Sequence, residues 1–578
     1  MQTGWCVFFL SAAGSLAQAQ AIVLVPEDQP TLQAGIDAVF PGGTVLVAPG
    51  TYFEHGLDFG GKNLTLRSTG GAAATVIDAK GGGRVFRFLS GEARDARVEG
   101  FTVTGGRAPD GDAGFVLFEP PLSLVLPTEG ADGGGVQISG ASPTLLDCVF
   151  VDNHAGRGGD GDQLTLGLMA GAAGGSGGAI SIHGGDPWIE GCVFTGNRAG
   201  DGGLGSFQAS AGLPGFDGGP GGHGGALFKA SGSSASVVGC VFFDNASGVG
   251  GAGGPGGQED LLSGAPPASG GAGGPGGDGG AVFLAGGSLL LRNLSVASNA
   301  ASAGGPGGLG GLGITVGDAA PGADGAAGSG GGLARQSGAG TLLNAVVFAN
   351  APDSLAGTFG VSFSNLAGGA AGPGNLDLDP AFASLASGDL RLTPGSPCVD
   401  AGSSETLAVT ALDADASSFS VATGGVVGFD LGTQLLDVDL DGNRRRFDDP
   451  ATPDTGVGPG AVVDMGAFEL GALAPPVPPA FWLLGTLSGT TPGLVVEGFA
   501  LALNPDAYFN LTLVNPGGGP LAPGLGSFSS EGEGSGQLFL PAGLAQLGGL
   551  TAHHAAVVFD LAEGLAEVSP AVALDFLP

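Results

Sequence analysis

One acidic loop has the residue types and spacing that a hard cation requires. Its oxygen-bearing side chains stand at Asp437, Asp439, Asp441 and Asn443, with Asp448 at the twelfth place. Alternating carboxylates before a turn glycine can surround Ca²⁺ with oxygen ligands. The loop departs from the usual pattern because Asp replaces a bidentate Glu at the last place and residues 444–446 are arginines. A Ca²⁺ site and a plain hairpin turn both fit these residues.

A second chemical hypothesis concerns two carboxylates, Asp147 and Glu190, which precede cysteines in successive copies of a repeat. On adjacent coils they are expected to stack about 5 Å apart. Such a pair is a candidate catalytic site for acid–base chemistry on a polysaccharide. Two solvated turn acids are the alternative, because no basic residue recurs beside them and the chain has only three lysines.

Two phenylalanines offer a binding surface rather than a reaction. Phe228 and Phe283 occupy equivalent outward positions, so their rings are expected to stack into a platform that suits a sugar ring. The insertions described below are expected to cover them instead. The histidines are scattered, and the rings of His553 and His554 point to opposite faces of a strand-like segment.

These residues are positioned by a unit that recurs along the chain. The segments DCVFVDN, GCVFTGN and GCVFFDN begin at Asp147, Gly191 and Gly239, and two degenerate copies follow. The closing asparagines are separated by 44, 48, 54 and 51 residues. An uneven period of this kind is typical of a solenoid with insertions. The repeat residues are Cys148, Phe150, Asn153, Cys192, Phe194, Asn197, Cys240, Phe242, Asn245, Asn299 and Asn350.

Each position of the unit has an expected role. Cys and the Phe two places later share a strand face and point inward. The asparagine is expected to take the left-handed conformation at a bend and to bond its stacked copies along the axis. The cysteines act as small buried hydrophobes or form a disulfide, for which neighbouring strands give poor geometry. Zinc binding is not indicated, because no Cys-x-x-Cys spacing occurs.

The extra length of each repeat lies between its asparagine and the next glycine pair. Four insertions follow from this, at 154–176, 198–223, 246–278 and 300–329, and all leave one edge of the solenoid. Their Gly-Gly-X triplets suit extended threefold helices packed as a side layer. Flexible glycine linker is the alternative.

Both ends of the solenoid resemble a known family. The start, TLQAGIDAVFPGGTVLVAPGTY, contains an amphipathic helix with Leu32, Ile36, Val39 and Phe40 on its apolar face. The end contains SPCVDAG, the acidic loop above and VVDMGAFEL. These segments are similar to bacterial right-handed parallel β-helix proteins of the pectin-lyase-like superfamily with a choice-of-anchor Q type region. The resemblance implies a right-handed β-helix and export, and it implies no single activity.

The remaining segments complete the predicted organisation. Residues 1–21 read as a secretory signal peptide, because an apolar run is followed by small-residue cleavage options. A parallel β-helix with a helical cap is expected over 22–370, and its C-terminal, anchor-Q-like end over 371–470. A proline-rich linker (471–480) then leads to alternating segments over 481–578 that predict a small β-sandwich. The fold class is therefore all-β.

The composition restricts the function. A formal net charge of −36 disfavours nucleic acid and anionic membrane surfaces, and no other apolar run is long enough for a transmembrane helix. The sequence favours a secreted or cell-surface structural or adhesive protein without catalysis. Polysaccharide or another cell-surface component is the expected partner. A lyase or hydrolase of acidic polysaccharide is the first alternative, and a non-catalytic carbohydrate-binding protein is the second.

Overall fold

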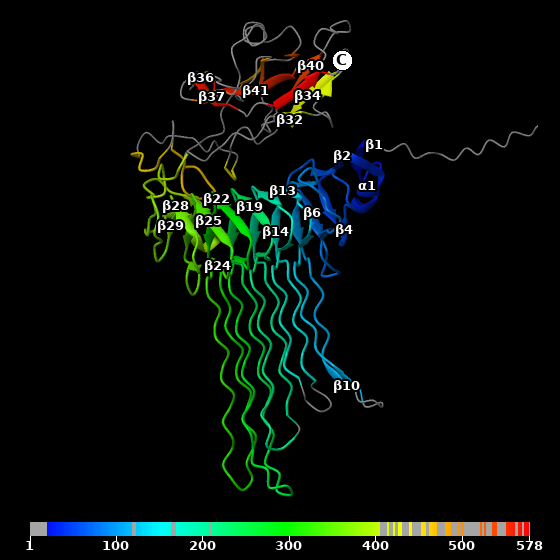
Figure 1. Ribbon diagram of the computed structural model, residues 1–578, viewed down its shortest axis with the longest axis vertical. Coiled ribbons are helices and arrows are strands. Elements are labelled where there is room, and N and C mark those ends of the chain that lie inside the picture. Colours follow the sequence, from blue (N-terminus) through cyan, green and yellow to red (C-terminus); the bar gives the residue numbers. More distant parts are fainter. Residues whose placement is uncertain are drawn as a thin grey trace, which may run out of the picture.

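The structure is a computed structural model that describes residues 20–117, 123–162, 169–208, 210–404, 439–441, 452–457 and 462–470, together with further strands between 413 and 576. Three long parallel sheets form a solenoid, and strands greatly outnumber helices (Figure 1). Each full coil contributes one strand to sheet C, then one to sheet A and one to sheet B. The prediction of an all-β parallel solenoid is confirmed. No helix in the described part of the chain is both long and apolar enough to cross a membrane.

The strands are short because each coil must turn three corners. Sheet A consists of β1 (Gln20–Val25), β2 (Val39–Val47), β5 (Thr65–Ser68), β8 (Arg97–Glu99), β13 (Thr144–Leu146), β16 (Trp188–Glu190), β19 (Ser234–Val238), β22 (Ser288–Arg292), β25 (Ala339–Leu343) and β28 (Gly360–Ser362). Sheet B consists of β3 (Gly50–Tyr52), β6 (Thr75–Asp78), β9 (Thr102–Thr104), β14 (Val149–Val151), β17 (Val193–Thr195), β20 (Val241–Phe243), β23 (Ser295–Ala297), β26 (Val346–Phe348) and β29 (Asn365–Leu366). Sheet C consists of β4 (Leu57–Asp58), β7 (Phe86–Phe88), β12 (Val136–Ser139), β15 (Ile180–His183), β18 (Leu227–Lys229), β21 (Val282–Leu284), β24 (Leu333–Arg335) and β27 (Leu355–Ala356).

The N-terminal end is covered by α1 (Leu32–Ala38), which connects β1 to β2. The Thr31 side chain caps the helix by accepting a hydrogen bond from the Ala34 N–H, and Leu32 and Ile36 are buried. Val39 and Phe40, expected on the helix, begin β2 instead. The helix ends two residues before Phe40, because the backbone of Val39 is already extended.

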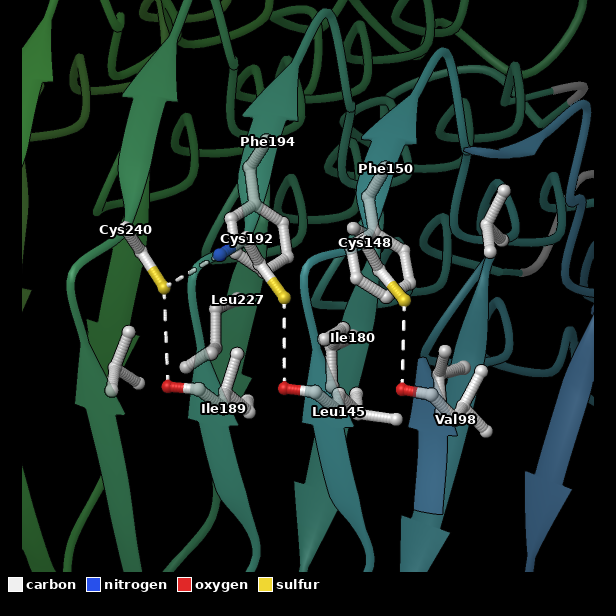
Figure 2. Packing of buried hydrophobic residues seen from close by; sticks show 14 of the residues in the cluster. Val98, Leu145, Cys148, Phe150, Ile180, Ile189, Cys192, Phe194, Leu227 and Cys240 are labelled. Carbon is white, nitrogen blue, oxygen red and sulfur yellow. Dashed lines mark hydrogen bonds between the residues drawn. The ribbon is translucent and has the colours of Figure 1, made fainter. Parts of the chain in front are cut away.

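The core is a set of side-chain columns that run along the solenoid axis. Cys148 and Cys192 are fully buried on successive coils, and each thiol faces a backbone carbonyl of the preceding coil at 3.7 Å (Figure 2). Every described cysteine is a free thiol. Two places further on, the Phe194 ring stacks on Phe150 and Phe242 at centroid distances of 5.0 and 4.6 Å. The predicted inward positions of Cys and Phe are confirmed.

The asparagine column lies inside one corner of the coil. The column consists of Asn153, Asn197, Asn245, Asn299 and Asn350. The Nδ2 atom of each of the first four donates to the Oδ1 atom of the asparagine on the next coil, at 2.9–3.1 Å. The expected left-handed conformation belongs to the residue before the asparagine, for example Asp152 (φ 53°) and Asp244 (φ 54°). The asparagine itself turns inward, because its side chain must satisfy backbone groups that the bend leaves unpaired. Asn245 Nδ2, for instance, also donates to the Phe194 carbonyl at 2.9 Å.

After the last coil the chain folds back along the outer face of sheet B. A hairpin of β30 (Phe382–Ser384) and β31 (Asp389–Leu392) flanks the short helix η1 (Leu385–Ser387). Further along, the Ala467 N–H donates to Ser295 Oγ at 3.0 Å. Apolar contacts bury Val241 and Ala297 of sheet B beneath this segment.

The C-terminal strands form two larger, mainly antiparallel sheets and one hairpin. The four-stranded sheet contains β32 (Asp413–Ala414), β34 (Val426–Asp430), β40 (Ser535–Phe539) and β38 (Leu521–Ala522). The six-stranded sheet contains β33 (Ser420–Val421), β43 (Val572–Phe576), β41 (Thr551–Asp560), β35 (Ala480–Thr486), β39 (Leu525–Ser527) and β42 (Gly564–Val568). The hairpin joins β36 (Leu494–Val496) to β37 (Phe499–Leu501). Strands from 413–430 thus pair with strands after 534, and a β-sandwich in this region stays a prediction.

Candidate functional site

The glycine-rich insertions form one projection that leaves a single edge of the solenoid (Figure 1). Each insertion contributes one extended leg that runs outward and a second leg that returns to the solenoid. We number the hairpins by their insertions: hairpin 1 (154–176), hairpin 2 (198–223), hairpin 3 (246–278) and hairpin 4 (300–329). Residues 107–132 add a preceding pair of legs that ends in β10 (Phe115–Leu117) and β11 (Ser123–Val125). This pair is not evident in the sequence, because Gly111 and Gly114 are spaced by three without a Gly-Gly doublet.

Backbone hydrogen bonds join legs of the same direction into two layers. Between outgoing legs the Gly202 N–H donates to the Val249 carbonyl at 2.8 Å. Between return legs the Gly221 N–H donates to the Pro275 carbonyl at 2.9 Å. In both layers the donors recur every third residue, which is the period of an extended threefold helix.

A second set of hydrogen bonds holds the two layers together. The Gly219 N–H donates to the Gly203 carbonyl, the Gly251 N–H to Gly219, and the Gly274 N–H to Gly251, each at 2.8 Å. This chain of donors alternates between an outgoing and a return leg, so each leg contacts two legs of the other layer. The insertions are therefore a packed layer, as the first of the two sequence hypotheses held, rather than flexible linker.

The close approach of these backbones requires glycine at the contact positions. A Cβ atom at Gly251 would lie 1.9 Å from the Gly203 carbonyl oxygen, and one at Gly274 would lie 2.0 Å from that of Gly219. No side chain fits at such a distance. Gly317, in the loop of hairpin 4, is different because a Cβ there would meet no atom within 4 Å.

Polar side chains join neighbouring hairpins where the return legs enter sheet C. At four of the glycine pairs that lead into sheet C, the residue before the pair accepts a hydrogen bond from a backbone N–H further along the chain, at the base of the next return leg. Asp132 Oδ1 accepts from Ser176, Ser176 Oγ from His223, His223 Nδ1 from Asp278, and Asp278 Oδ1 from Ser329. The sequence signal for this ladder is the polar residue that precedes the glycines at the start of each of these sheet C strands, at positions 132, 176, 223, 278 and 329.

The phenylalanine platform exists but is covered by histidine rings. Phe228 and Phe283 stack with centroids 6.0 Å apart and planes within 4°. His223 stacks on Phe283 at 4.3 Å, and His183 lies against Phe228 at 5.5 Å. Phe283 is buried as a result. Burial lowers the pKa of His223, which fits the acceptor role of its Nδ1 atom.

The two candidate catalytic carboxylates are not equivalent in register. Glu190 pairs with Leu146 in sheet A, whereas Asp147 follows the strand in a left-handed turn with φ 50°. This one-residue offset separates a strand position from a corner position, so the expected stack of the two acids is absent. Glu190 accepts a hydrogen bond from Trp188 Nε1 at 2.7 Å. Local burial, aided by the charge of Glu99, raises the pKa of Asp147 to about 6.

Two of the five predicted calcium ligands lie in the described part of the chain. Asp439 is buried and accepts hydrogen bonds from the N–H groups of Asp441 and Glu469 at 3.0 and 2.7 Å. Asp437, Asn443 and Asp448 lie outside the described residues. Among the residues that are described, no group of three His, Cys, Asp or Glu side chains is placed to hold a metal ion. The Ca²⁺ site stays a prediction.

The distal ends of hairpins 3 and 4 expose aliphatic side chains. Of the sixteen large apolar residues exposed in the described part, twelve lie on the projection. We define the tip patch as Leu261, Leu262, Leu312, Ile314 and Val316, with exposed fractions of 57, 99, 58, 68 and 52%. Exposed apolar clusters often mark interaction sites, so the tip patch is a candidate contact surface.

Comparisons with protein-family models, curated proteins and solved structures gave no match to this chain.

Proposed function

We propose that this protein is an exported, non-catalytic adhesive scaffold whose glycine-rich projection makes the contact. The observation that supports it is the two-layer hydrogen-bonded bundle, which carries exposed apolar loops away from the solenoid. The proposal places the chain with right-handed pectin-lyase-like β-helix proteins that have a choice-of-anchor Q type region. Right-handed winding is the strong preference for connections between parallel strands.

The energetics of the projection favour a role in display. Ordering glycine-rich legs costs more backbone entropy than ordering other residues, and the legs have little side-chain burial to offset it. Their order depends on repeated backbone hydrogen bonds and on the base ladder from Asp132 to Ser329. A chain that only needed to connect coils would use short turns. The length of the legs is explained if their distal loops have a function.

The acidic composition and the N-terminal segment support export. The described carboxylates also favour a structural role over a catalytic one. Asp147 lies in a turn, Glu190 bonds to Trp188, and Asp439 bonds to two backbone N–H groups. In the proposed function Glu190 and Asp439 stabilise the coil and its C-terminal segment, whereas Asp147 is a turn residue that takes no part in a reaction.

The test uses the full chain immobilised through its C-terminus on beads under flow. Surfaces of cells, of polysaccharide and of plain polymer are compared. Gly251→Ala is expected to abolish retention by disrupting the bundle, whereas Gly317→Ala leaves it unchanged. Equal retention of both variants would contradict the proposal. Products released from uronate or neutral polysaccharides would establish the enzyme alternative, and glycan binding that Gly251→Ala does not alter would establish the carbohydrate-binding alternative.

A further inference from the structure

The loops of hairpins 3 and 4 are fixed to each other at the tip of the projection. The Glu259 carboxylate accepts hydrogen bonds from the N–H groups of Ile314 and Thr315 and from the Thr315 hydroxyl. The Glu259 N–H in turn donates to the Leu312 carbonyl at 3.0 Å. These bonds lower the pKa of Glu259, so the clamp is ionised at neutral pH. Leu261 and Leu262 follow Glu259 closely in the chain, so the tip patch is held together before it binds anything.

The side chains of these two hairpins restrict the class of ligand that the tip patch can bind. Hairpins 3 and 4 contain Glu259, Asp260, Asp278, Asp318 and Asp324 but no lysine or arginine. They also contain no aromatic residue. Sugar platforms rely on aromatic faces, whereas aliphatic side chains fill apolar hollows. The carboxylates repel anionic lipid, anionic polysaccharide and a second copy of this chain, whose formal net charge is −36.

We propose that the tip patch binds a protein surface that combines an apolar hollow with lysine or arginine side chains. The inference rests on the proposed adhesive function and specifies its partner class. Leu262, which is 99% exposed, and its neighbours enter the hollow, while the acidic groups around them face the basic rim. Preorganisation by Glu259 reduces the ordering entropy that binding would otherwise cost.

The experiment measures binding of the full chain to immobilised helical peptides of defined pattern. A Leu/Lys peptide presents an apolar face with a basic rim, a Leu/Glu peptide reverses the charge, and a Ser/Lys peptide removes the apolar face. We expect wild type to bind the Leu/Lys peptide at least about tenfold more tightly than the other two, a difference of about 1.4 kcal/mol. The quadruple variant Leu261→Ser/Leu262→Ser/Ile314→Ser/Val316→Ser should lose that advantage while its net charge stays the same.

A second variant keeps the result interpretable. Glu259→Gln retains every apolar side chain but weakens the clamp, so it should bind the Leu/Lys peptide less tightly than wild type and more tightly than the quadruple variant. Equal binding of wild type and the quadruple variant would overturn the proposal, as would tighter binding to zwitterionic phosphatidylcholine vesicles or loss of a self-association in the quadruple variant. If the quadruple variant still adheres to surfaces while Gly251→Ala does not, the adhesive function stands and only the tip assignment fails.

Discussion

The solenoid and its projection are both built from repeated units, but different interactions hold successive units together. In the solenoid, successive coils are held by buried side chains, as in the stack of Phe150, Phe194 and Phe242. In the projection, successive legs are held by backbone hydrogen bonds between glycines such as Gly219, Gly251 and Gly274. The solenoid should therefore lose stability when buried side-chain atoms are removed, and the projection should lose stability when side-chain atoms are added at its contact glycines. Four substitutions test this contrast.

The largest effect is expected from truncation in the solenoid. Phe194→Ala removes a ring that is fully buried between two others, and such cavities cost about 3–5 kcal/mol. The free energy of unfolding in denaturant measures the loss. Phe53→Ala is the control, because Phe53 is 61% exposed and contacts Lys80 at the surface. A similar loss in both variants would contradict the assignment of the stack as the core.

Adding a side-chain atom at a contact glycine should destabilise the projection but not the solenoid. Gly251→Ala places a Cβ 1.9 Å from the Gly203 carbonyl oxygen, and overpacking of this kind costs about 1–3 kcal/mol or more. Hydrogen exchange should accelerate at Gly219, Gly251 and Gly274 while the amides of sheet A stay protected. Gly317→Ala should leave both regions unchanged. Uniform acceleration across the chain would show that the two regions are not separately stabilised.

The junction between the regions should depend on pH. Burial holds the folded-state pKa of His223 below its unfolded value, which is about 6.5. The neutral ring therefore contributes stability that is complete above that pH and is lost as the pH falls below it. We expect the amides in the return leg of hairpin 3 to have smaller protection factors at pH 5.5 than at pH 7.5, once the slower intrinsic exchange at the lower pH is taken into account, by an effect of at most about 1 kcal/mol. In His223→Gln this pH dependence should be smaller, and an unchanged dependence would exclude His223 as the cause.

The smallest expected effect is a gain in stability at a corner of the solenoid. The folded-state pKa of Asp147, about 6, exceeds its unfolded value. The ionised carboxyl therefore lowers the free energy of unfolding, and this loss develops as the pH rises through about 6. Asp147→Asn should raise stability at pH 7 by less than about 1 kcal/mol, because the side chain is closely surrounded by protein atoms but still open to solvent, which screens its charge. The substitution should have no effect near pH 3, where the carboxyl is protonated. Asn293 and Asn344 already occupy the equivalent left-handed position. Thermal unfolding at both pH values checks the sign, with Asp152→Asn as the control.

Much of the solenoid could be predicted from local pattern, and the errors were errors of register. Alternation placed Cys148 and Phe150 inward correctly, because side chains alternate strictly along a strand. The same reasoning aligned Asp147 with Glu190, although the structure pairs Glu190 with Leu146. The sequence also assigned the left-handed conformation to Asn153 instead of Asp152. A shift of one residue changes which face a group occupies, and composition does not reveal it.

The sequence by itself determined where the coils repeat, which side chains form the core columns and where the glycine-rich insertions begin and end. These features depend on periodicity, which is a property of neighbouring residues. Only the tertiary structure decided which legs pair, that residues 107–132 join them, and that the loops carrying Leu262 and Ile314 are joined at one tip. The physical reason is that the legs are joined through backbone groups, which are the same at every glycine, so their partners are set by the stacking of the coils beneath them.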